Sequence, residues 1–204
     1  MKKILLGIAI MLMSTAYLQA EPIWSYNGVT DHEGAWGSIA PEYARCELGT
    51  AQSPIDIGRA TTSPDLPAIV ADYKPQNATI EKLRQGYRLM LPEGGALTLG
   101  KTKYTLRYIE MHTFMEKFFP LEMHLFHEDT NKNVLVIAVM FETGNENPAI
   151  SPIAQALTTD TKTTNIDTSK LLPATLGYYA YSGSLTYPPC SEGVEWRVLK
   201  TPAT

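Results

Sequence analysis

An unbroken apolar run, Val134-Leu-Val-Ile-Ala-Val-Met-Phe141, constrains the fold of this chain more than any other segment. A run of this length without alternation is typical of a strand that is buried on both faces of a sheet. Apolar and polar residues alternate from Tyr104 to His112, and a second strand-like segment follows from Leu121 to His127. Alternation with a period of two indicates further strands beside the buried one.

Earlier and later segments add to the same architecture. Gly86 to Leu91 and Ala96 to Leu99 flank Pro92-Glu-Gly-Gly95, which has the composition of a turn. Ser151-Pro152 begins a short helix, because a capping residue precedes a proline at the first helical position. Residues 21–60 lack a sustained period and are expected to form an irregular N-terminal wrap. The sequence therefore predicts one mostly β domain with small helices.

The N-terminus has the order of a secretory signal peptide. Two lysines precede an apolar run, Ile4 to Met13, and a polar stretch that ends in Leu18-Gln19-Ala20. Ten apolar residues are too few to span a bilayer. Cleavage is expected after Ala20, with Ser14-Thr15-Ala16 as a second site. We therefore predict a signal peptide over residues 1–20, a mature domain over residues 21–204, and a periplasmic or secreted location.

Charge and cysteine content narrow the classes of partner. The formal net charge is −4, and the lack of a basic excess gives no reason to expect nucleic acid or a membrane surface as a partner after signal cleavage. Cys46 and Cys190 are the two cysteines of the chain. In an oxidising compartment they are expected to form one disulfide, although two free buried thiols remain the alternative.

Histidine is scarce, and three of the four histidines fall in one short segment. On a strand Glu110 and His112 share one face, while His124 and His127 point to opposite faces. Pairing the two strands would bring Glu110, His112 and His124 together and leave a zinc ion a fourth position for water. Glu122 would then orient a ligand imidazole. By spacing alone the motif is weak, and polar residues on a solvent-facing sheet surface are the alternative.

Four segments in the same order resemble the α-class carbonic anhydrases. They are Trp24-Ser-Tyr26, Gln52-Ser-Pro-Ile-Asp-Ile57, Glu122-Met-His-Leu-Phe-His127 and Ser184-Leu-Thr-Tyr-Pro-Pro-Cys-Ser-Glu-Gly-Val-Glu-Trp196. The resemblance implies a large, mainly antiparallel twisted sheet with a metal at the bottom of a cone-shaped cleft. It also implies a lyase that hydrates carbon dioxide reversibly to bicarbonate and a proton with Zn²⁺ as cofactor. The two cysteines match the disulfide of secreted and bacterial members.

The resemblance assigns roles to individual residues. His112 and His124 match the second and third zinc ligands, and Glu122 matches the carboxylate that contacts the third ligand. Thr186 matches the threonine that orients the nucleophile, and Glu116 the glutamate that in turn orients that threonine.

The substrate pocket and the proton path are implied in the same way. The residues that match the apolar wall beside the metal are Val136, Leu185, Trp196 and Phe126, the last of which replaces a smaller residue. Tyr87, near the position of the family's proton-shuttle histidine, and Tyr26 are candidates for the proton path. A phenol titrates near pKa ~10 and is a poor shuttle at neutral pH, so an ordinary strand residue is the favoured reading of Tyr87.

Several positions depart from the family pattern. Glu110 stands where the family has its first histidine ligand, and Tyr108 stands where a glutamine contacts that ligand. A carboxylate can bind zinc, but its charge should make the metal's water less acidic and the hydration reaction weaker. Loss of the metal is the alternative, which would leave an inactive carbonic-anhydrase-like binding module. The segment from Thr113 to Leu121 is short, and the sequence stops at Thr204 where members usually continue, so the domain is expected to lack the usual C-terminal segment.

Overall fold

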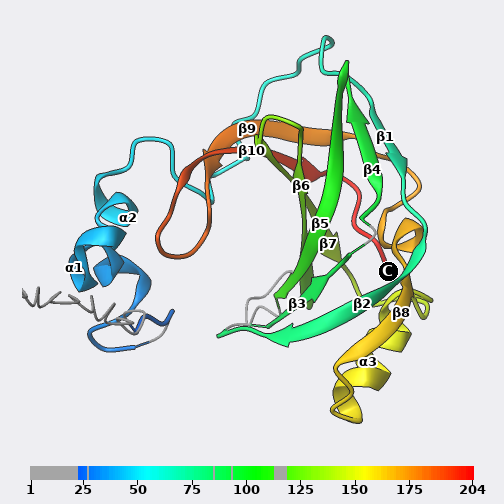
Figure 1. Cartoon of the computed structure of the whole chain (residues 1–204). Coiled ribbons are helices and arrows are strands. Elements are labelled where there is room, and N and C mark those ends of the chain that lie inside the picture. Colours follow the sequence, from blue (N-terminus) through cyan, green and yellow to red (C-terminus); the bar gives the residue numbers. More distant parts are fainter. Residues whose placement is uncertain (1–22, 27, 85, 93, 113–118) are drawn as a thin grey trace, which may run out of the picture.

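The fold is built around one large sheet. A computed structural model describes residues 23–26, 28–84, 86–92, 94–112 and 119–204. Within them, ten strands form a single twisted sheet that is mainly antiparallel (Figure 1). The predicted signal peptide, residues 1–20, lies outside the described residues and stays a prediction.

The strands follow one another along the chain with few helices between them. They are β1 (Ile69–Asp72), β2 (Pro75–Lys82), β3 (Tyr87–Met90), β4 (Ala96–Leu99), β5 (Thr102–His112), β6 (Leu121–Glu128), β7 (Val134–Phe141), β8 (Thr163–Asp167), β9 (Tyr178–Ser184) and β10 (Glu192–Leu199). Their order in the sheet is β8-β2-β3-β5-β6-β7-β10-β9, and β4 pairs with both β1 and β5. Of the described pairs, only β7 and β10 run parallel. The mostly β, mainly antiparallel prediction is confirmed.

The helices are short, and most of them belong to the N-terminal wrap. They are the 3-10 helices η1 (Glu33–Ala35), η2 (Pro41–Tyr43) and η3 (Thr168–Leu171) and the α-helices α1 (Trp36–Ile39), α2 (Arg45–Leu48) and α3 (Ile150–Thr158). Figure 1 shows α1 and α2 on the side of the sheet where β9 turns into β10, whereas α3 lies at the other side. Among the described residues, no helix combines the length and apolar character needed to cross a membrane.

Strand β7 is buried on both faces, as the apolar run predicts. Its residues Leu135 to Val139 are at most 1% exposed. One face packs into the larger of two apolar clusters, which contains Ile137. The other face contributes Val136 and Ala138 to a smaller cluster. The sheet therefore separates a main core from a second apolar layer, and the second layer lies on the face that carries His124.

Strands β3 and β4 do not form a hairpin around the turn-like segment between them. Both pair with β5, β3 along residues 108–111 and β4 along residues 102–105. Hydrogen bonds from Leu91 N to the Arg107 carbonyl (3.1 Å) and from Leu106 N to the Gly95 carbonyl (2.9 Å) bridge the interruption. The segment is thus an interruption between two strands that lie one after the other along β5, because both run in the same direction beside it.

The disulfide prediction is confirmed. Cys46 of α2 is bonded to Cys190, at a sequence separation of 144 residues. The described residues include no free cysteine. The bond joins the N-terminal wrap to the loop between β9 and β10. A second connection comes from Ser53 and Ser184, whose backbone N–H groups each donate to the other's hydroxyl at 3.0 Å.

His127 of β6 is a buried neutral histidine with a structural role. Its Nδ1 lies 3.2 Å from the Leu135 carbonyl, which can only accept, so Nδ1 carries the proton. The Tyr73 hydroxyl then donates to Nε2 at 2.6 Å. Burial lowers the pKa of His127 from 6.5 to about 4.

We therefore expect folding stability to fall as the pH drops from about 6.5 toward about 4. The unfolded chain binds a proton at His127 in this range and the folded chain does not. The contribution between pH 7 and pH 5 is roughly 2 kcal/mol. Urea unfolding of the metal-free wild-type protein and of the His127→Gln variant, each at pH 7 and pH 5, measures this change in the free energy of unfolding. Equal pH dependence in both proteins would show that His127 is not responsible.

Candidate metal centre

Three buried side chains converge on one point, and we call Glu110, His112 and His124 the metal group. One ligand atom from each lies within 4.8 Å of the other two. Glu110 and His112 share a face of β5 because they are two residues apart. His124 of β6 is directly opposite Glu110 in the β5–β6 register. Their exposed fractions are 0%, 7% and 4%, so the polar-surface alternative does not hold for these residues.

The atoms that face one another in the metal group suit a cation. Among the described residues, neither Oε2 of Glu110 nor Nδ1 of His124 has a hydrogen-bond partner, although both are buried. Nε2 of His112 lies 3.6 Å from that Oε2 atom. Buried polar atoms are almost always paired in folded proteins. Two imidazole nitrogens and one carboxylate oxygen form a known zinc ligand set that leaves a fourth position open, so the residues present fit Zn²⁺.

The second oxygen of Glu110, Oε1, is fully engaged. Arg88 of β3 donates to it from Nη2 at 2.7 Å and from Nε at 3.1 Å. The Tyr187 hydroxyl donates to the same atom at 2.9 Å. Burial by itself would raise the pKa of Glu110, but the neighbouring His112, Arg88 and Tyr187 side chains bring it below the ordinary value. Glu110 is therefore a carboxylate at neutral pH, with one oxygen held and one available.

His124 is held from behind by Glu122. The imidazole Nε2 lies 2.8 Å from Oε1 of Glu122. A carboxylate accepts, so Nε2 carries the proton and the lone pair of Nδ1 faces the metal group. Burial would raise the pKa of Glu122, but the hydrogen bond and charge of His124, with His112 beside it, lower it. The tautomer that this contact selects is the one a metal ligand needs.

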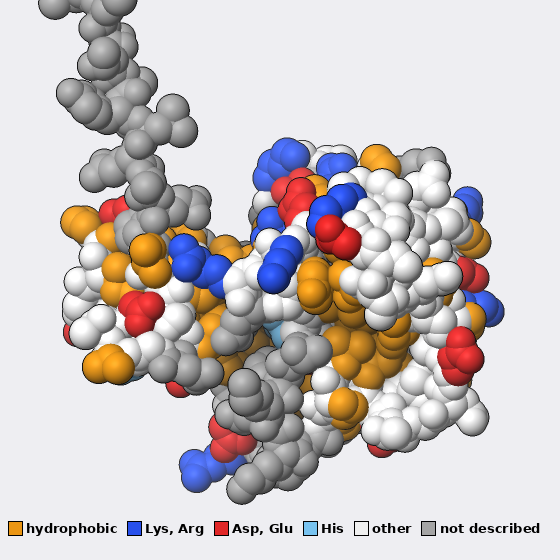
Figure 2. Space-filling view, turned by 90° about the horizontal axis from the view of Figure 1, so that it is seen from below, with side chains coloured by type: hydrophobic (Ala, Val, Ile, Leu, Met, Phe, Trp, Pro, Cys, Tyr) orange, Lys and Arg blue, Asp and Glu red, His pale blue; other side chains and the backbone are white. Residues whose placement is uncertain are grey.

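An apolar wall stands beside the metal group. Phe126, Val136 and Trp196 belong to the smaller apolar cluster, and Leu185 packs against it. The Trp196 ring lies 4.9 Å from that of His124, edge to face. Figure 2 shows histidine surface at the bottom of a hollow that hydrophobic side chains border. The structure thus brings the four predicted wall residues into one patch next to a metal-group imidazole.

The remaining predicted site residues have different placements. Thr186 is half-buried in the β9–β10 loop, and its carbonyl accepts from the Tyr26 hydroxyl at 3.4 Å. Burial, with the charge of Glu110, raises the pKa of Tyr26 to about 12. Tyr87 packs against the main core, on the opposite face of β3 from Arg88. Glu116 lies outside the described residues.

Two residues that contact the metal group were missed from sequence alone, Arg88 and Tyr187. The sequence does not reveal the contact of Arg88 with Glu110, because this contact depends on the β3–β5 register, in which the two residues are direct partners. Gly86 permits this pairing, since it has φ +97° and a side chain there would collide with the Met111 carbonyl. Tyr187 belongs to the family-like segment from Ser184 to Trp196, but nothing in that segment indicates that the Tyr187 hydroxyl contacts Glu110. The sequence feature that could have indicated Arg88 is the presence of a charged residue within a strand of alternating residues.

Aromatic side chains of the N-terminal wrap support Tyr187. Trp24 stacks on Tyr187 with ring centroids 6.0 Å apart. Trp24 also packs edge to face against Tyr26 and Trp36, at 5.6 and 5.3 Å. The position of the Tyr187 hydroxyl on Glu110 therefore depends on the wrap as well as on the sheet.

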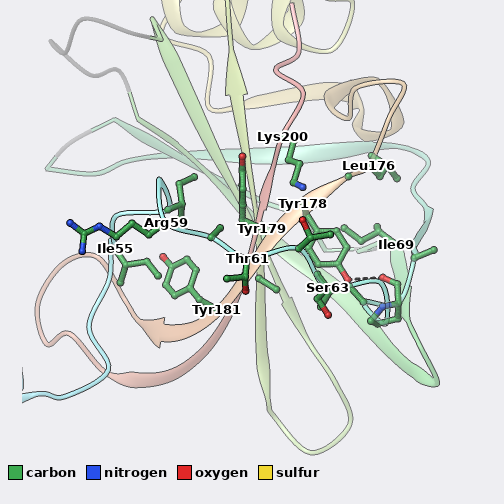
Figure 3. A pocket seen from close by; sticks show the side chains of 18 of the residues that line it. Ile55, Arg59, Thr61, Ser63, Ile69, Leu176, Tyr178, Tyr179, Tyr181 and Lys200 are labelled. Atoms are coloured by element: carbon green, nitrogen blue, oxygen red, sulfur yellow. Dashed lines mark hydrogen bonds between the residues drawn. The ribbon is translucent and has the colours of Figure 1, made fainter.

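A separate hollow follows β9 and the loop before β1 (Figure 3). It has a volume of about 1010 Å³ and is lined by residues 55–57, 59–63, 66–69, 176–181 and 200. Tyr178 closes one part of it by donating to the Pro67 carbonyl at 2.6 Å. No member of the metal group lines this hollow.

Comparisons with known proteins agree with this site. The family model for eukaryotic-type carbonic anhydrases matches residues 31–204. A carbonic anhydrase of Neisseria gonorrhoeae is 39% identical over 188 residues, which are 87% of this chain and 74% of that protein. The structure of α-carbonic anhydrase from Thermovibrio ammonificans with the inhibitor sulfanilamide is 32% identical, covers 90% of this chain and 86% of its own, and gives a TM-score of 0.80. Dioscorin complexed with ascorbate is 26% identical, covers 89% and 83%, and gives a TM-score of 0.81.

Proposed function

The chain belongs to the α-class carbonic anhydrase family, and from this premise we propose that it catalyses the zinc-dependent, reversible hydration of carbon dioxide to bicarbonate and a proton. The observation that carries the proposal is the convergence of one ligand atom each from Glu110, His112 and His124 in a buried site. Two of these atoms have no hydrogen bond from the described residues, although burial of such atoms is costly. A bound zinc ion would supply a Lewis acid that makes water nucleophilic at neutral pH.

The protein's own residues hold the ligand atoms in place. Glu122 fixes the tautomer and orientation of His124 through its contact with Nε2. Arg88 and Tyr187 fix Glu110 through its Oε1 atom. Ligand orientation of this kind stabilises the arrangement before substrate arrives, so little reorganisation is needed during the reaction.

The apolar wall suits a nonpolar gas. Val136, Trp196 and Phe126 belong to one buried apolar cluster, and Leu185 packs against it. We propose that this wall keeps water from one side of the metal group. We propose that carbon dioxide occupies this patch and that the Thr186 hydroxyl orients the nucleophile, with Glu116 as its partner. Fixed orientation of two reacting groups is worth several kcal/mol of barrier in general.

We propose that turnover is slower than in members with three imidazole ligands. A carboxylate oxygen bound directly to the metal lowers its effective charge more than a neutral imidazole does, and Arg88, which contacts the other oxygen of Glu110, offsets only part of this effect. Phe126 also stacks on Tyr108 with ring centroids 4.5 Å apart. We propose that this large aromatic pair narrows the substrate pocket beside the apolar wall. The Tyr26 phenol has a pKa of about 12, so it stays protonated at neutral pH and cannot release the product proton by ionising.

We propose a periplasmic or secreted site of action. The Cys46–Cys190 disulfide is typical of proteins that fold in oxidising compartments. The lysines, apolar run and small residues of the first 20 positions have the order of an export signal.

The test is stopped-flow hydration of carbon dioxide by the oxidised mature protein, residues 21–204. Zinc-loaded protein should bind close to one zinc per chain and hydrate carbon dioxide above the buffer rate. Protein stripped with a chelator should lose the activity and regain it when zinc returns. Tyr87→Phe, on the opposite face of β3, is the control and should behave like the wild type.

One observation favours a second function, an inactive carbonic-anhydrase-like binding module. The Glu110–Arg88 ion pair, at 2.7 Å, already neutralises the carboxylate without a metal. A folded protein that takes up no zinc and hydrates no carbon dioxide would reject the enzyme and leave this alternative.

A further inference from the structure

The two oxygens of Glu110 have unequal surroundings. Oε1 receives three hydrogen bonds, two from Arg88 and one from the Tyr187 hydroxyl. Oε2 receives none from the described residues and faces the imidazole of His112. A carboxylate so divided can offer a cation one oxygen only, because the lone pairs of the other are already engaged.

Arg88 also changes the charge that a cation meets. Glu110 contributes one negative charge, and the arginine guanidinium beside it contributes one positive charge at 2.7 Å. His112 and His124 are neutral when they act as metal ligands. The metal group together with Arg88 therefore has no net charge, as a set of three imidazoles would have.

Several contacts hold the Arg88 side chain next to Glu110. It lies directly opposite Glu110 in the β3–β5 register, and its side chain is only 26% exposed. The guanidinium carbon lies 4.8 Å from the centre of the Tyr108 ring, a cation–π contact. Glu81 approaches from the solvent side at 3.9 Å. Tyr108 thus holds the Arg88 guanidinium in a cation–π pair while the guanidinium contacts Oε1 of Glu110.

We propose that Arg88 is a positioning residue that keeps Glu110 a one-oxygen zinc ligand and gives the Glu110–Arg88 pair the net charge of a neutral imidazole. The inference rests on the proposed function, since it concerns the same metal centre. Glu110 brings a negative charge to a position where the family has a neutral histidine, and Arg88 supplies the compensating positive charge. The centre therefore keeps the net charge of a three-histidine site with different residues.

The experiment measures the affinity for zinc by competition with a chromophoric chelator near pH 8. Arg88→Met and Arg88→Gln remove the charge, Arg88→Lys retains it, and Tyr187→Phe removes one donor to Oε1 without changing charge. Because a cation beside the metal repels it, the Met and Gln variants should bind zinc about tenfold more tightly than the wild type. The Lys and Phe variants should stay within about threefold of it.

The second readout is the visible absorption of Co²⁺ in the same proteins. Arg88→Met and Arg88→Gln remove the two guanidinium hydrogen bonds to Oε1 and leave the one from Tyr187, so Oε1 can join Oε2, the coordination number should rise and the absorption should weaken. Wild type and Arg88→Lys should keep the stronger absorption of a four-coordinate site. Neither change is expected of a residue that only supports the fold.

The outcomes separate the inference from the proposed function. Weaker or unchanged zinc binding in both uncharged variants, with unchanged Co²⁺ absorption, would overturn the role of Arg88 and leave the enzyme intact. A wild-type protein that binds neither ion would overturn the proposed function, and this inference with it. Thermal unfolding of each variant shows that folded proteins are being compared.

Discussion

Glu110→Ala is expected to weaken zinc binding by roughly a hundredfold or more and to reduce carbon dioxide hydration to the buffer rate. The substitution removes one of the three proposed protein ligands, a larger change than loss of an outer contact, which alone costs about 10–100-fold in affinity. His112 and His124 remain, but two ligands leave the metal exposed to exchange with solvent. Chelator competition and stopped-flow hydration measure the two effects.

Glu81→Ala is the matched control for this substitution. Glu81 is also a carboxylate beside Arg88, at 3.9 Å, but it lies on the exposed side and is not part of the metal group. Its removal should leave zinc affinity close to that of the wild type. If Glu110→Ala kept full affinity in a folded protein, Glu110 would not be a ligand, and the two histidines would have to bind zinc with other groups.

Loss of the disulfide is expected to produce the largest change in stability. Cys46→Ser with Cys190→Ser opens a loop of 144 residues. The chain-entropy estimate for a loop of this length is roughly 5 kcal/mol. For a protein of this size the corresponding fall in melting temperature is about 10–20 °C. Differential scanning calorimetry of the double variant against the oxidised protein measures it.

The same double variant should also bind zinc less tightly. Cys190 lies three residues after Tyr187, whose hydroxyl contacts Glu110. Releasing the wrap also removes the support of Trp24 on the Tyr187 ring. The wild-type protein with its disulfide reduced should reproduce both effects. A melting temperature within about 3 °C of the oxidised protein would contradict the entropic role of the bond.

Local patterns allowed much of the fold to be predicted. The unbroken apolar run of β7 indicated burial on both faces, and the structure confirms it. Alternation along β5 placed Glu110 and His112 on one face, since the direction of a side chain on a strand depends only on its position in the chain. The break between β3 and β4 was not predicted as such, because a turn composition does not determine whether the chain reverses.

The sequence by itself determined the strands β3 to β7, the shared face of Glu110 and His112, and, through the family's motifs, the family. Each depends on residues that are close together in the chain or on a pattern held in common with relatives. Only the tertiary structure decided that Arg88 faces Glu110 and that Tyr187 reaches the same oxygen. These contacts join residues 22 and 77 positions apart. They depend on strand register and on the packing of a distant loop, which are set by the free energy of the whole fold and not by any local pattern.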